Sequence, residues 1–251
     1  MYGSANEAAA VECALHTLVR IQSLTRTTPD LIPDYATSRL HDEFELCPTW
    51  LVEGLLARTV SAAERAMLDD VRGILIASIS AQPRCCVHRD YHSRNLLWHQ
   101  GRLGIVDFQD ALWGPQLYDL ASLLRDCYHR FPETEVVHWR RRYAELARQA
   151  GLPSTGDAAT FAQSFDYTAV QRQIKAIGIF ARLKLRDHRN THLEDIVPVI
   201  DQLISVTANH QPLAPLSRWL MTRSDRPRCA TSSERPGQPP HESDDSCGRS
   251  R

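Results

Sequence analysis

The chain has 251 residues, of which 43% are hydrophobic and 24% charged, and its formal net charge is −1. These proportions are ordinary for a globular protein of one large or two small domains. A net charge so close to zero gives no global field that would recruit nucleic acid. The composition therefore excludes a strongly basic nucleic-acid-binding protein, and it leaves enzymes and small-molecule-binding proteins open.

The cysteine pattern and the distribution of apolar residues indicate a cytoplasmic protein with no membrane partner. The seven cysteines include no Cys-x-x-Cys pair, so they predict neither a disulfide framework nor a zinc site. No basic segment followed by an apolar core opens the chain, and no apolar run reaches the ~18 residues that a bilayer span requires. The sequence leaves the oligomeric state open.

Three helices are predicted in the first third of the chain. Apolar residues at helical spacing predict an amphipathic helix over 8–22. Pro48 fits the first turn of a second helix, over 48–55. Ser61 and Glu64 have the spacing of a capping box and predict the start of a third helix. The residues expected on the buried face of this third helix are Met67, Leu68, Val71 and Leu75.

The string HRDYHSRN, followed after a short turn by GIVDF, places three metal- and proton-handling side chains at fixed spacing. They are Asp90, Asn95 and Asp107. Phosphoryl transfer needs a carboxylate that orients and deprotonates the acceptor hydroxyl, and hard oxygen ligands that hold Mg²⁺ against the phosphates. Asp90 and Asn95 fit the catalytic-loop pattern H-R-D-x-x-x-x-N, and Asp107 supplies the second metal ligand. The motif predicts a kinase that uses ATP and Mg²⁺.

The residues on either side of the motif predict the strands that this chemistry requires. An apolar strand at 85–87 leads into the loop, and a strand at 96–98 leaves it. A turn at 100–101 returns the chain along 103–108. This hairpin would deliver the three polar side chains to one end. The alternative is a surface hairpin whose polar residues are merely solvated.

The rest of the chain is predicted to be mostly helical, followed by a polar tail. Apolar periodicity and end signals predict helices over 117–128, 133–150, 158–185 and 194–207. The last 30 residues contain no Leu, Ile, Val, Met, Phe, Tyr or Trp, so we expect them to be disordered. The sequence is therefore divided into a folded catalytic lobe, 1–221, and a disordered tail, 222–251.

Three stretches resemble the aminoglycoside phosphotransferase-like kinases, and within them the bacterial cell-wall-recycling kinases of N-acetylmuramate and N-acetylglucosamine. They are HRDYHSRNLL, GIVDFQDALWGPQLYDLASLLRDCY and FDYTAVQRQIKAIGIFARL. The resemblance implies an α+β, mostly helical fold. It implies the C-terminal, catalytic lobe of a protein-kinase-like enzyme, with a short β-hairpin that carries the catalytic and metal residues. It further implies phosphorylation of the anomeric hydroxyl of an amino sugar by ATP and Mg²⁺.

The resemblance implies the roles of base and metal ligands for the three motif residues. It also implies that Asp119 supports the catalytic loop from the following helix. The local alternative makes Asp119 the N-cap of its own helix. His88 and Arg89 are expected to shape the loop rather than to touch the substrate.

A basic face of the longest predicted helix is the first candidate for substrate binding. At about 100° per residue, Arg172, Lys175 and Arg182 fall on one side of that helix. This side could meet an anionic sugar such as N-acetylmuramate, whereas cationic aminoglycosides would favour an acidic pocket. Arg125 and Asp126 are a second candidate, because a fork of donors beside an acceptor suits sugar hydroxyls. The alternatives are solvated charges on the helix and a structural ion pair at 125–126.

The chain lacks the nucleotide-binding features that such kinases place before the catalytic lobe. A glycine-rich loop and a strand lysine normally meet the phosphates. The first 84 residues contain only Gly3, Gly54 and Gly73 and no lysine. We therefore expect an amino-sugar kinase whose activity is impaired in this chain. The alternatives are an inactive fragment or non-catalytic binding module, or a phosphotransferase acting on aminoglycosides or other small molecules.

Overall fold

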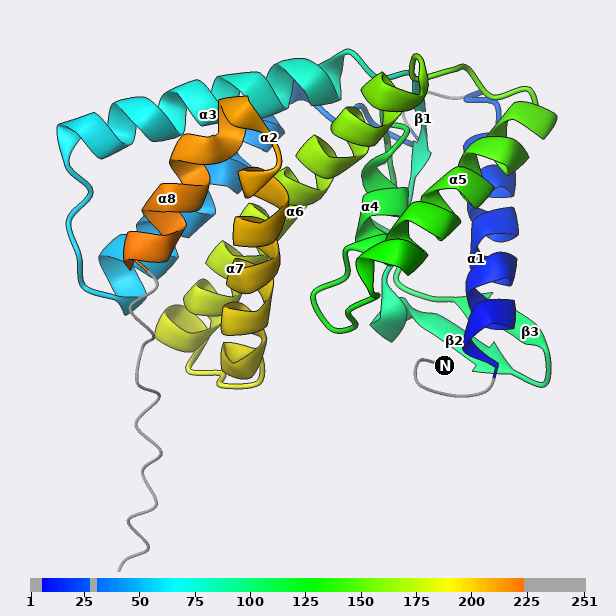
Figure 1. Cartoon of the computed structure of the whole chain (residues 1–251). Coiled ribbons are helices and arrows are strands. Elements are labelled where there is room, and N and C mark those ends of the chain that lie inside the picture. Colours follow the sequence, from blue (N-terminus) through cyan, green and yellow to red (C-terminus); the bar gives the residue numbers. More distant parts are fainter. Residues whose placement is uncertain (1–5, 28–30, 224–251) are drawn as a thin grey trace, which may run out of the picture.

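The computed structural model of the protein describes residues 6–27 and 31–223. Figure 1 shows that helices make up most of this part of the chain, and the short strands form two separate antiparallel pairs. The expected mostly helical α+β class is confirmed. No helix in the described ranges is long and apolar enough to cross a membrane. Of the tail predicted to be disordered, 222–251, residues 222 and 223 are helical, which contradicts the prediction there, and residues 224–251 lie outside the described part.

The N-terminal part folds into α1 (Glu7–Gln22), α2 (Thr37–Leu46), the π-helical segment η1 (Cys47–Leu55) and α3 (Ala62–Ser80). The three predicted helices correspond to α1, η1 and α3. The sequence pattern did not predict α2, because its ten residues are mostly polar and bury only three side chains. α2 continues directly into η1, so Pro48 lies early in the π-helical segment rather than after a loop.

The predicted capping box opens α3. Ser61 Oγ accepts a hydrogen bond from the backbone N–H of Glu64 at 3.3 Å, and the Glu64 carboxylate accepts one from the Ser61 N–H at 2.9 Å. These two contacts satisfy backbone donors that the first turn would otherwise leave unpaired. Leu68, Val71 and Leu75 are buried as expected, whereas Met67 is only partly buried.

The strands frame the polar loop. β1 (Arg84–Val87) pairs with β4 (Leu112–Pro115), and β2 (Leu96–His99) pairs with β3 (Arg102–Ile105). The turn between β2 and β3 is the predicted one, with positive φ at both of its residues. The return strand stops before 108, because Asp107 has a φ of 69° and cannot continue it. The sequence analysis missed β4, whose glycine and proline are unfavourable in strands.

Five α-helices and the short 3-10 helix η3 (Gln211–Leu213) complete the described chain. The α-helices are α4 (Tyr118–Leu124), α5 (Glu133–Gln149), α6 (Ala158–Asp187), α7 (Leu193–Ala208) and α8 (Ala214–Arg223). The first four were predicted, although α4 ends four residues earlier than the sequence suggested. α8 was missed and extends beyond the boundary drawn at 221.

α6 joins the two main apolar cores of the molecule. Figure 1 shows it crossing the fold between α2, α3, α7 and α8 on one side and α4, α5 and α1 on the other. One core lies among η1, α3, α6, α7 and α8, and the second lies among α1, α4 and α5. The catalytic loop enters the second core through Tyr91, whose hydroxyl donates to the carbonyl of Ala14 at 2.8 Å.

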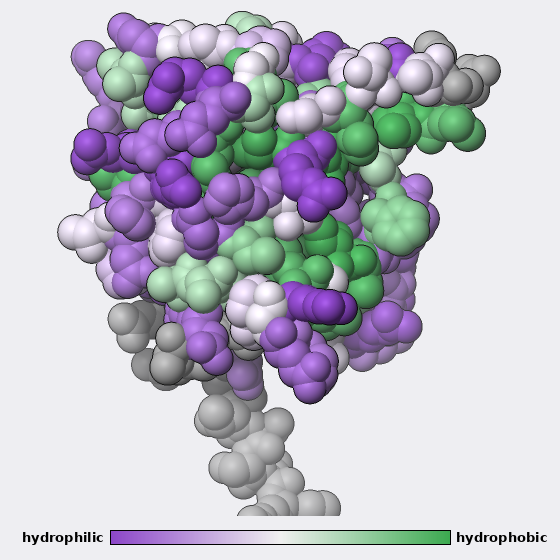
Figure 2. Space-filling view, turned by 90° about the vertical axis from the view of Figure 1, so that its right-hand side faces the viewer, coloured by the Kyte–Doolittle hydropathy of each residue, from purple (hydrophilic) through white to green (hydrophobic). Residues whose placement is uncertain are grey.

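The face that carries α1 and the β2–β3 hairpin is partly apolar. Figure 2 shows hydrophobic surface gathered on this side of the molecule. The large exposed apolar side chains of the loop and hairpin regions include Leu31, Leu97, Val106 and Phe108. The large apolar residues of α1 are buried, apart from the partly buried Ile21, so these exposed side chains come from loops and the hairpin.

Candidate active site

The Asp119 carboxylate holds the turn that opens the catalytic loop. It is fully buried in the first turn of α4, where Oδ2 accepts the His88 N–H at 2.6 Å and Oδ1 accepts the Arg89 N–H at 2.9 Å. The N-cap of α4 is Leu117, so Asp119 is not the N-cap of its own helix. Burial raises the pKa of Asp119 to about 7, although the two N–H donors act in the opposite direction. Arg89 has a φ of 78°, a costly conformation that these contacts hold in place.

Asn95 and Asp107 face each other at one end of the β2–β3 hairpin. Asn95 Nδ2 donates to the backbone carbonyl of Asp90 at 2.9 Å and lies 3.5 Å from Asp107 Oδ2. Because the amide nitrogen is engaged in this way, the amide oxygen of Asn95 is left as an acceptor. Asp107 is exposed, and its Oδ1 accepts from the Gln109 side chain at 2.5 Å. The structure thus brings the two predicted metal ligands together beside the predicted base.

These two side chains suit a magnesium ion that arrives with a nucleotide. An amide oxygen and a carboxylate are the hard ligands that Mg²⁺ prefers. Within residues 6–27 and 31–223, no group of three or more His, Cys, Asp or Glu could hold a metal ion by itself. Mg²⁺ usually keeps several waters and takes only one or two protein carboxylates, with substrate phosphates supplying the remaining ligands. The donor set therefore fits nucleotide-bound Mg²⁺ better than an enclosed transition-metal site.

Asp90 lines a small cavity of about 160 Å³ between the catalytic loop, the segment after α4, and α6. We call this cavity the acceptor pocket. It is lined by Asp90, His92, Asp126, Cys127, Tyr128, Arg172, Lys175, Ala176, Ile179 and Phe180. Arg172 and Lys175, which the sequence placed on one basic helix face, meet here. Neither is a solvated charge, because Arg172 is buried and Lys175 is largely buried.

The two cations of the acceptor pocket have different surroundings. Lys175 Nζ forms an ion pair with Glu43 Oε1 at 3.0 Å and donates to the Tyr118 hydroxyl at 3.1 Å. The Arg172 guanidinium lies 5.3 Å from the centre of the Tyr118 ring. Burial opposes the charge of Arg172, but neighbouring groups that include Tyr118 and Asp90 keep its pKa above the ordinary value. Lys175 is thus paired with Glu43, whereas Arg172 forms no ion pair with another described residue and shares the pocket with the Asp90 and Asp126 carboxylates.

Glu43 is a residue that the sequence analysis missed. It is buried on α2, pairs with Lys175, and lies 3.5 Å from Arg89 Nη2 of the catalytic loop. The Tyr35 hydroxyl donates to its second oxygen. Glu43 thereby links the catalytic loop to α6. The only signal in the sequence was its place beside the apolar Phe44, which gained meaning once α2 was known to be a helix.

Of the remaining predicted substrate residues, one lines the acceptor pocket and two do not. Asp126 lines the acceptor pocket and also accepts the backbone N–H of Ser93 at 2.8 Å, so it supports the catalytic loop. Arg125 is buried in ion pairs with Glu133 at 2.7 Å and Asp166 at 3.6 Å. Arg125 and Arg182 are not among the residues that line the acceptor pocket. Arg125 thus forms structural ion pairs, but with Glu133 and Asp166 rather than with Asp126.

A family model and several curated proteins match the chain. The model described as the phosphotransferase enzyme family (APH) matches residues 3–155. An N-acetylmuramate/N-acetylglucosamine kinase of Neisseria meningitidis serogroup B is 38% identical over 208 residues, which are 83% of this chain and 62% of the relative. A Pseudomonas putida kinase of the same name is 36% identical over 82% of this chain and 60% of the relative. The chain therefore spans less than two thirds of the length of these relatives.

Solved structures of kinases share the fold. A Plasmodium vivax ethanolamine kinase superposes with a TM-score of 0.55 at 12% identity, covering 84% of this chain and 60% of that one. An amicoumacin kinase, solved in complex with AMP-PNP, Ca²⁺ and Ami, gives a TM-score of 0.53 at 16% identity, covering 83% of this chain and 62% of that one. At such low identity the likeness concerns the fold alone.

Proposed function

Because the chain belongs to the phosphotransferase enzyme family, we propose that it forms the catalytic lobe of a kinase that transfers the γ-phosphoryl group of ATP to an amino sugar. The acceptor is the anomeric hydroxyl of N-acetylmuramate or N-acetylglucosamine, the two sugars in the names of its relatives. One observation carries the proposal. Asp90 lines the acceptor pocket, while its backbone carbonyl accepts the amide of Asn95, which faces Asp107.

Asp90 acts as the base in this proposal. Its carboxylate orients the sugar hydroxyl and accepts the proton late in a loose transition state. The hydrogen bond from Asn95 to the Asp90 carbonyl fixes the base relative to the metal ligands. Asn95 and Asp107 would hold Mg²⁺, which would neutralise charge that develops on the transferring phosphoryl group. Positioning and electrostatics supply nearly all the catalysis in this chemistry.

The hairpin offers a surface for the nucleotide base. Leu97 and Val106 are exposed, 54% and 41% respectively, and Val106 directly precedes Asp107. The backbone N–H of Val106 donates to the carbonyl of Asn95 at 3.1 Å. This apolar surface therefore adjoins the two proposed metal ligands. A base lying on these side chains would place its phosphates toward the Asn95–Asp107 pair.

One side chain of the acceptor pocket, Arg172, favours N-acetylmuramate as the first acceptor. Arg172 retains its charge there, whereas Lys175 is paired with Glu43. The lactyl carboxylate is the group that distinguishes N-acetylmuramate from N-acetylglucosamine. We therefore assign Arg172 to the recognition of that carboxylate.

The test compares N-acetylmuramate, N-acetylglucosamine and kanamycin as phosphate acceptors. The enzyme is a chimera that completes this chain with the part of the N. meningitidis relative that the chain does not match. We expect transfer to both sugars, with N-acetylmuramate preferred. Arg172→Gln should lower kcat/KM for N-acetylmuramate by about 10-fold or more and affect N-acetylglucosamine less, because one charge-assisted hydrogen bond is lost. Transfer confined to kanamycin would overturn the proposed acceptor.

A further inference from the structure

The acceptor pocket has an apolar side that the phosphoryl transfer described above does not use. α6 presents four residues to the pocket, Arg172, Lys175, Ala176 and Ile179. They are spaced at helical intervals, so they lie on one face of α6. The first two are charged and the last two are apolar. Ile179, which interrupts the basic face of the helix, therefore belongs to the site.

We propose that this apolar side, together with His92, is a subsite for the acetamido group that N-acetylmuramate and N-acetylglucosamine share. The methyl group lies against Ala176, Ile179 and the Tyr128 ring, which we call the apolar wall. His92 donates a hydrogen bond to the carbonyl oxygen of the acetamido group. The inference rests on the proposed function, and it concerns a part of the sugar that the base and the arginine leave without a partner.

The backbone of the catalytic loop directs His92 into the pocket. His92 is extended, with a φ of −130° and a ψ of 173°, and side chains alternate in direction along an extended chain. Tyr91 points into the second core, where it is fully buried. Asp90 and His92, on either side of Tyr91, both line the acceptor pocket. The base and the donor for the acetamido group thus come from one short stretch of chain.

The imidazole of His92 has one nitrogen available to a ligand. Nδ1 is buried without a hydrogen-bond partner, whereas Nε2 is not buried and forms no hydrogen bond with a described residue. Burial lowers the pKa of His92, although Asp126 and Asp90 act in the opposite direction, so the ring carries a single proton at about pH 7. A buried N–H without a partner is rarer than a buried acceptor without one, which assigns the proton to Nε2. Nε2 is then a donor, and a carbonyl oxygen suits it.

The apolar wall is partly exposed and held in place. Ala176, Ile179 and Tyr128 are half-buried and pack against the core formed by η1, α3, α6, α7 and α8, so each keeps surface that a ligand can contact. The Arg94 guanidinium lies 3.7 Å from the centre of the Tyr128 ring, and the His92 ring meets that ring edge-on at 5.3 Å. A methyl group gains from such a wall, whereas a sugar hydroxyl would lose its hydrogen bonds to water there.

The volume of the acceptor pocket suits one end of a sugar. At about 160 Å³ it is smaller than the range of about 300–1,000 Å³ that is typical of small-molecule sites. The acetamido group is attached to the carbon next to the anomeric carbon, so it enters the pocket together with the reacting hydroxyl. The rest of the ring then lies at the opening.

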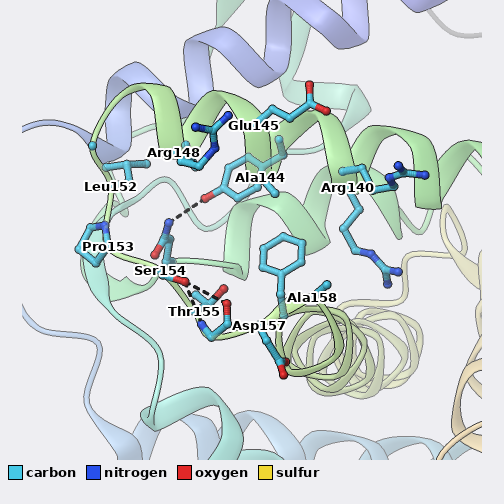
Figure 3. A pocket seen from close by; sticks show the side chains of 17 residues that line it. Arg140, Ala144, Glu145, Arg148, Leu152, Pro153, Ser154, Thr155, Asp157 and Ala158 are labelled. Atoms are coloured by element: carbon cyan, nitrogen blue, oxygen red, sulfur yellow. Dashed lines mark hydrogen bonds between the residues drawn. The ribbon is translucent and has the colours of Figure 1, made fainter.

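A larger cavity offers a ligand another place to bind. It has a volume of about 780 Å³ and shares no lining residue with the acceptor pocket. Figure 3 shows it between α5, the loop that follows α5, and the first turn of α6. We call it the α5–α6 cleft. Binding of a sugar in this cleft is the alternative that a mapping experiment has to exclude.

The probes are N-acetylglucosamine, glucose and N-butanoylglucosamine, titrated into the isotope-labelled 251-residue chain by NMR. We expect N-acetylglucosamine to bind with a millimolar Kd and to shift amides at 90–95, 126–128 and 172–180. Magnetisation saturated on the protein should pass most strongly to its acetyl methyl protons. Glucose lacks the methyl and the carbonyl and should bind about tenfold more weakly. N-butanoylglucosamine is two methylenes longer and should also bind about tenfold more weakly, because the wall has no room for them.

Two substitutions test the two parts of the subsite. Ile179→Ala makes room at the wall and should strengthen the binding of N-butanoylglucosamine about tenfold. Leu185→Ala is the matched control on α6, since Leu185 is also partly exposed but does not line the pocket, and it should change neither sugar. His92→Leu should weaken N-acetylglucosamine about fivefold and leave glucose unchanged. His92→Gln restores an N–H donor and should recover most of that loss.

Three results would each overturn the subsite: equal affinity for N-acetylglucosamine and glucose, shifts that map to the α5–α6 cleft, or no gain for N-butanoylglucosamine in Ile179→Ala. Phosphate transfer by the chimera tests the proposed function separately. Transfer to both sugars without selective binding of the acetamido group would leave the function standing and remove the subsite. Selective binding without transfer would remove the function and leave the subsite standing.

Discussion

Asp90 belongs to both halves of the proposed site. It lines the acceptor pocket, and its backbone carbonyl accepts a hydrogen bond from the Asn95 side chain. Asp90→Asn keeps the size of the side chain and removes the base. In the chimera we expect kcat to fall by about 100-fold or more with the nucleotide Kd nearly unchanged. Steady-state kinetics and calorimetry measure the two quantities. A variant that loses ATP binding and keeps kcat would rule out Asp90 as the base.

Asp107 tests the metal half of the site. Asp107→Ala removes the only carboxylate of the Asn95–Asp107 pair, so we expect turnover below detection and a loss of Mg²⁺-dependent nucleotide affinity. Asp110→Ala is the matched control, since Asp110 is also exposed and lies three residues further along the chain. Equal turnover in the wild type and Asp107→Ala would remove the metal assignment.

The buried Asp119 predicts a pH dependence in the catalytic loop. Its pKa is about 7 in the folded protein, against an ordinary value of 3.8. Between these pH values the folded state keeps a proton that the unfolded state has released, so the stability from this group falls as pH rises from about 4 to about 7. Protonation also weakens the acceptor of the His88 and Arg89 N–H groups. Their amide proton shifts should therefore titrate with a midpoint near pH 7.

The same NMR titration contains its own controls. Asp119→Asn should abolish the transition at both amides. The Thr160 amide, bound by Asp157, should show no transition near pH 7, because its hydrogen bonds hold the pKa of Asp157 below the ordinary value. A midpoint below pH 5 at His88 and Arg89 would contradict the effect of burial on Asp119.

At the scale of elements, α6 packs closely on the junction of α2 and η1. A Cβ placed on Gly178 would lie 2.6 Å from the Cys47 backbone nitrogen, a contact that no side chain can relieve. Gly178→Ala should therefore push α6 away and lower the free energy of unfolding by about 1–3 kcal/mol. Calorimetry would record this as a Tm lowered by roughly 2–12 °C.

Gly73 is the matched control for that substitution. It also lies within a helix, α3, but a Cβ there would meet nothing within 4 Å. Gly73→Ala should raise stability by about 0.5–1 kcal/mol, because alanine restricts the unfolded chain more than glycine does. Equal effects of the two substitutions would show that the contact between α6 and the α2–η1 junction is not tight.

At the scale of the whole molecule, we predict that the 251-residue chain alone has little kinase activity. It contains neither a glycine-rich loop nor a lysine before residue 175, so the γ-phosphate lacks its usual cover and cation. The side chains of Leu31 and Phe108 are also exposed, and both line a cavity together with Ile105 of the hairpin. We expect turnover at least a thousandfold below about 1 per second, a normal kinase rate.

Calorimetric ATP titration and sugar-dependent ADP release measure this on the chain as it stands. Asp90→Asn serves as the blank, because any residual turnover that survives it does not come from the proposed site. Micromolar ATP affinity with turnover of about 1 per second or faster would show that a glycine-rich loop and a strand lysine are dispensable.

The sequence by itself determined the catalytic loop, the β2–β3 hairpin and most of the helices. These features depend on local patterns: the spacing of Asp90, Asn95 and Asp107, the turn residues of the hairpin, and the capping box before α3. It also predicted that Arg172 and Lys175 share a face of α6, since helical periodicity alone fixes that relation.

Only the tertiary structure decided which of these charges reach the acceptor pocket. Arg125 and Lys175 both pair with glutamates. Arg125 pairs with Glu133 outside the acceptor pocket, whereas Lys175 pairs with Glu43 and lines the pocket. Glu43 could not be assigned from the sequence, because its partners lie on elements far along the chain. The hydrogen bonds among Gln22, Gln116 and Tyr143 likewise join α1, the segment after β4 and α5, which lie far apart along the chain. Spacing specifies local geometry, whereas packing between distant elements decides partners.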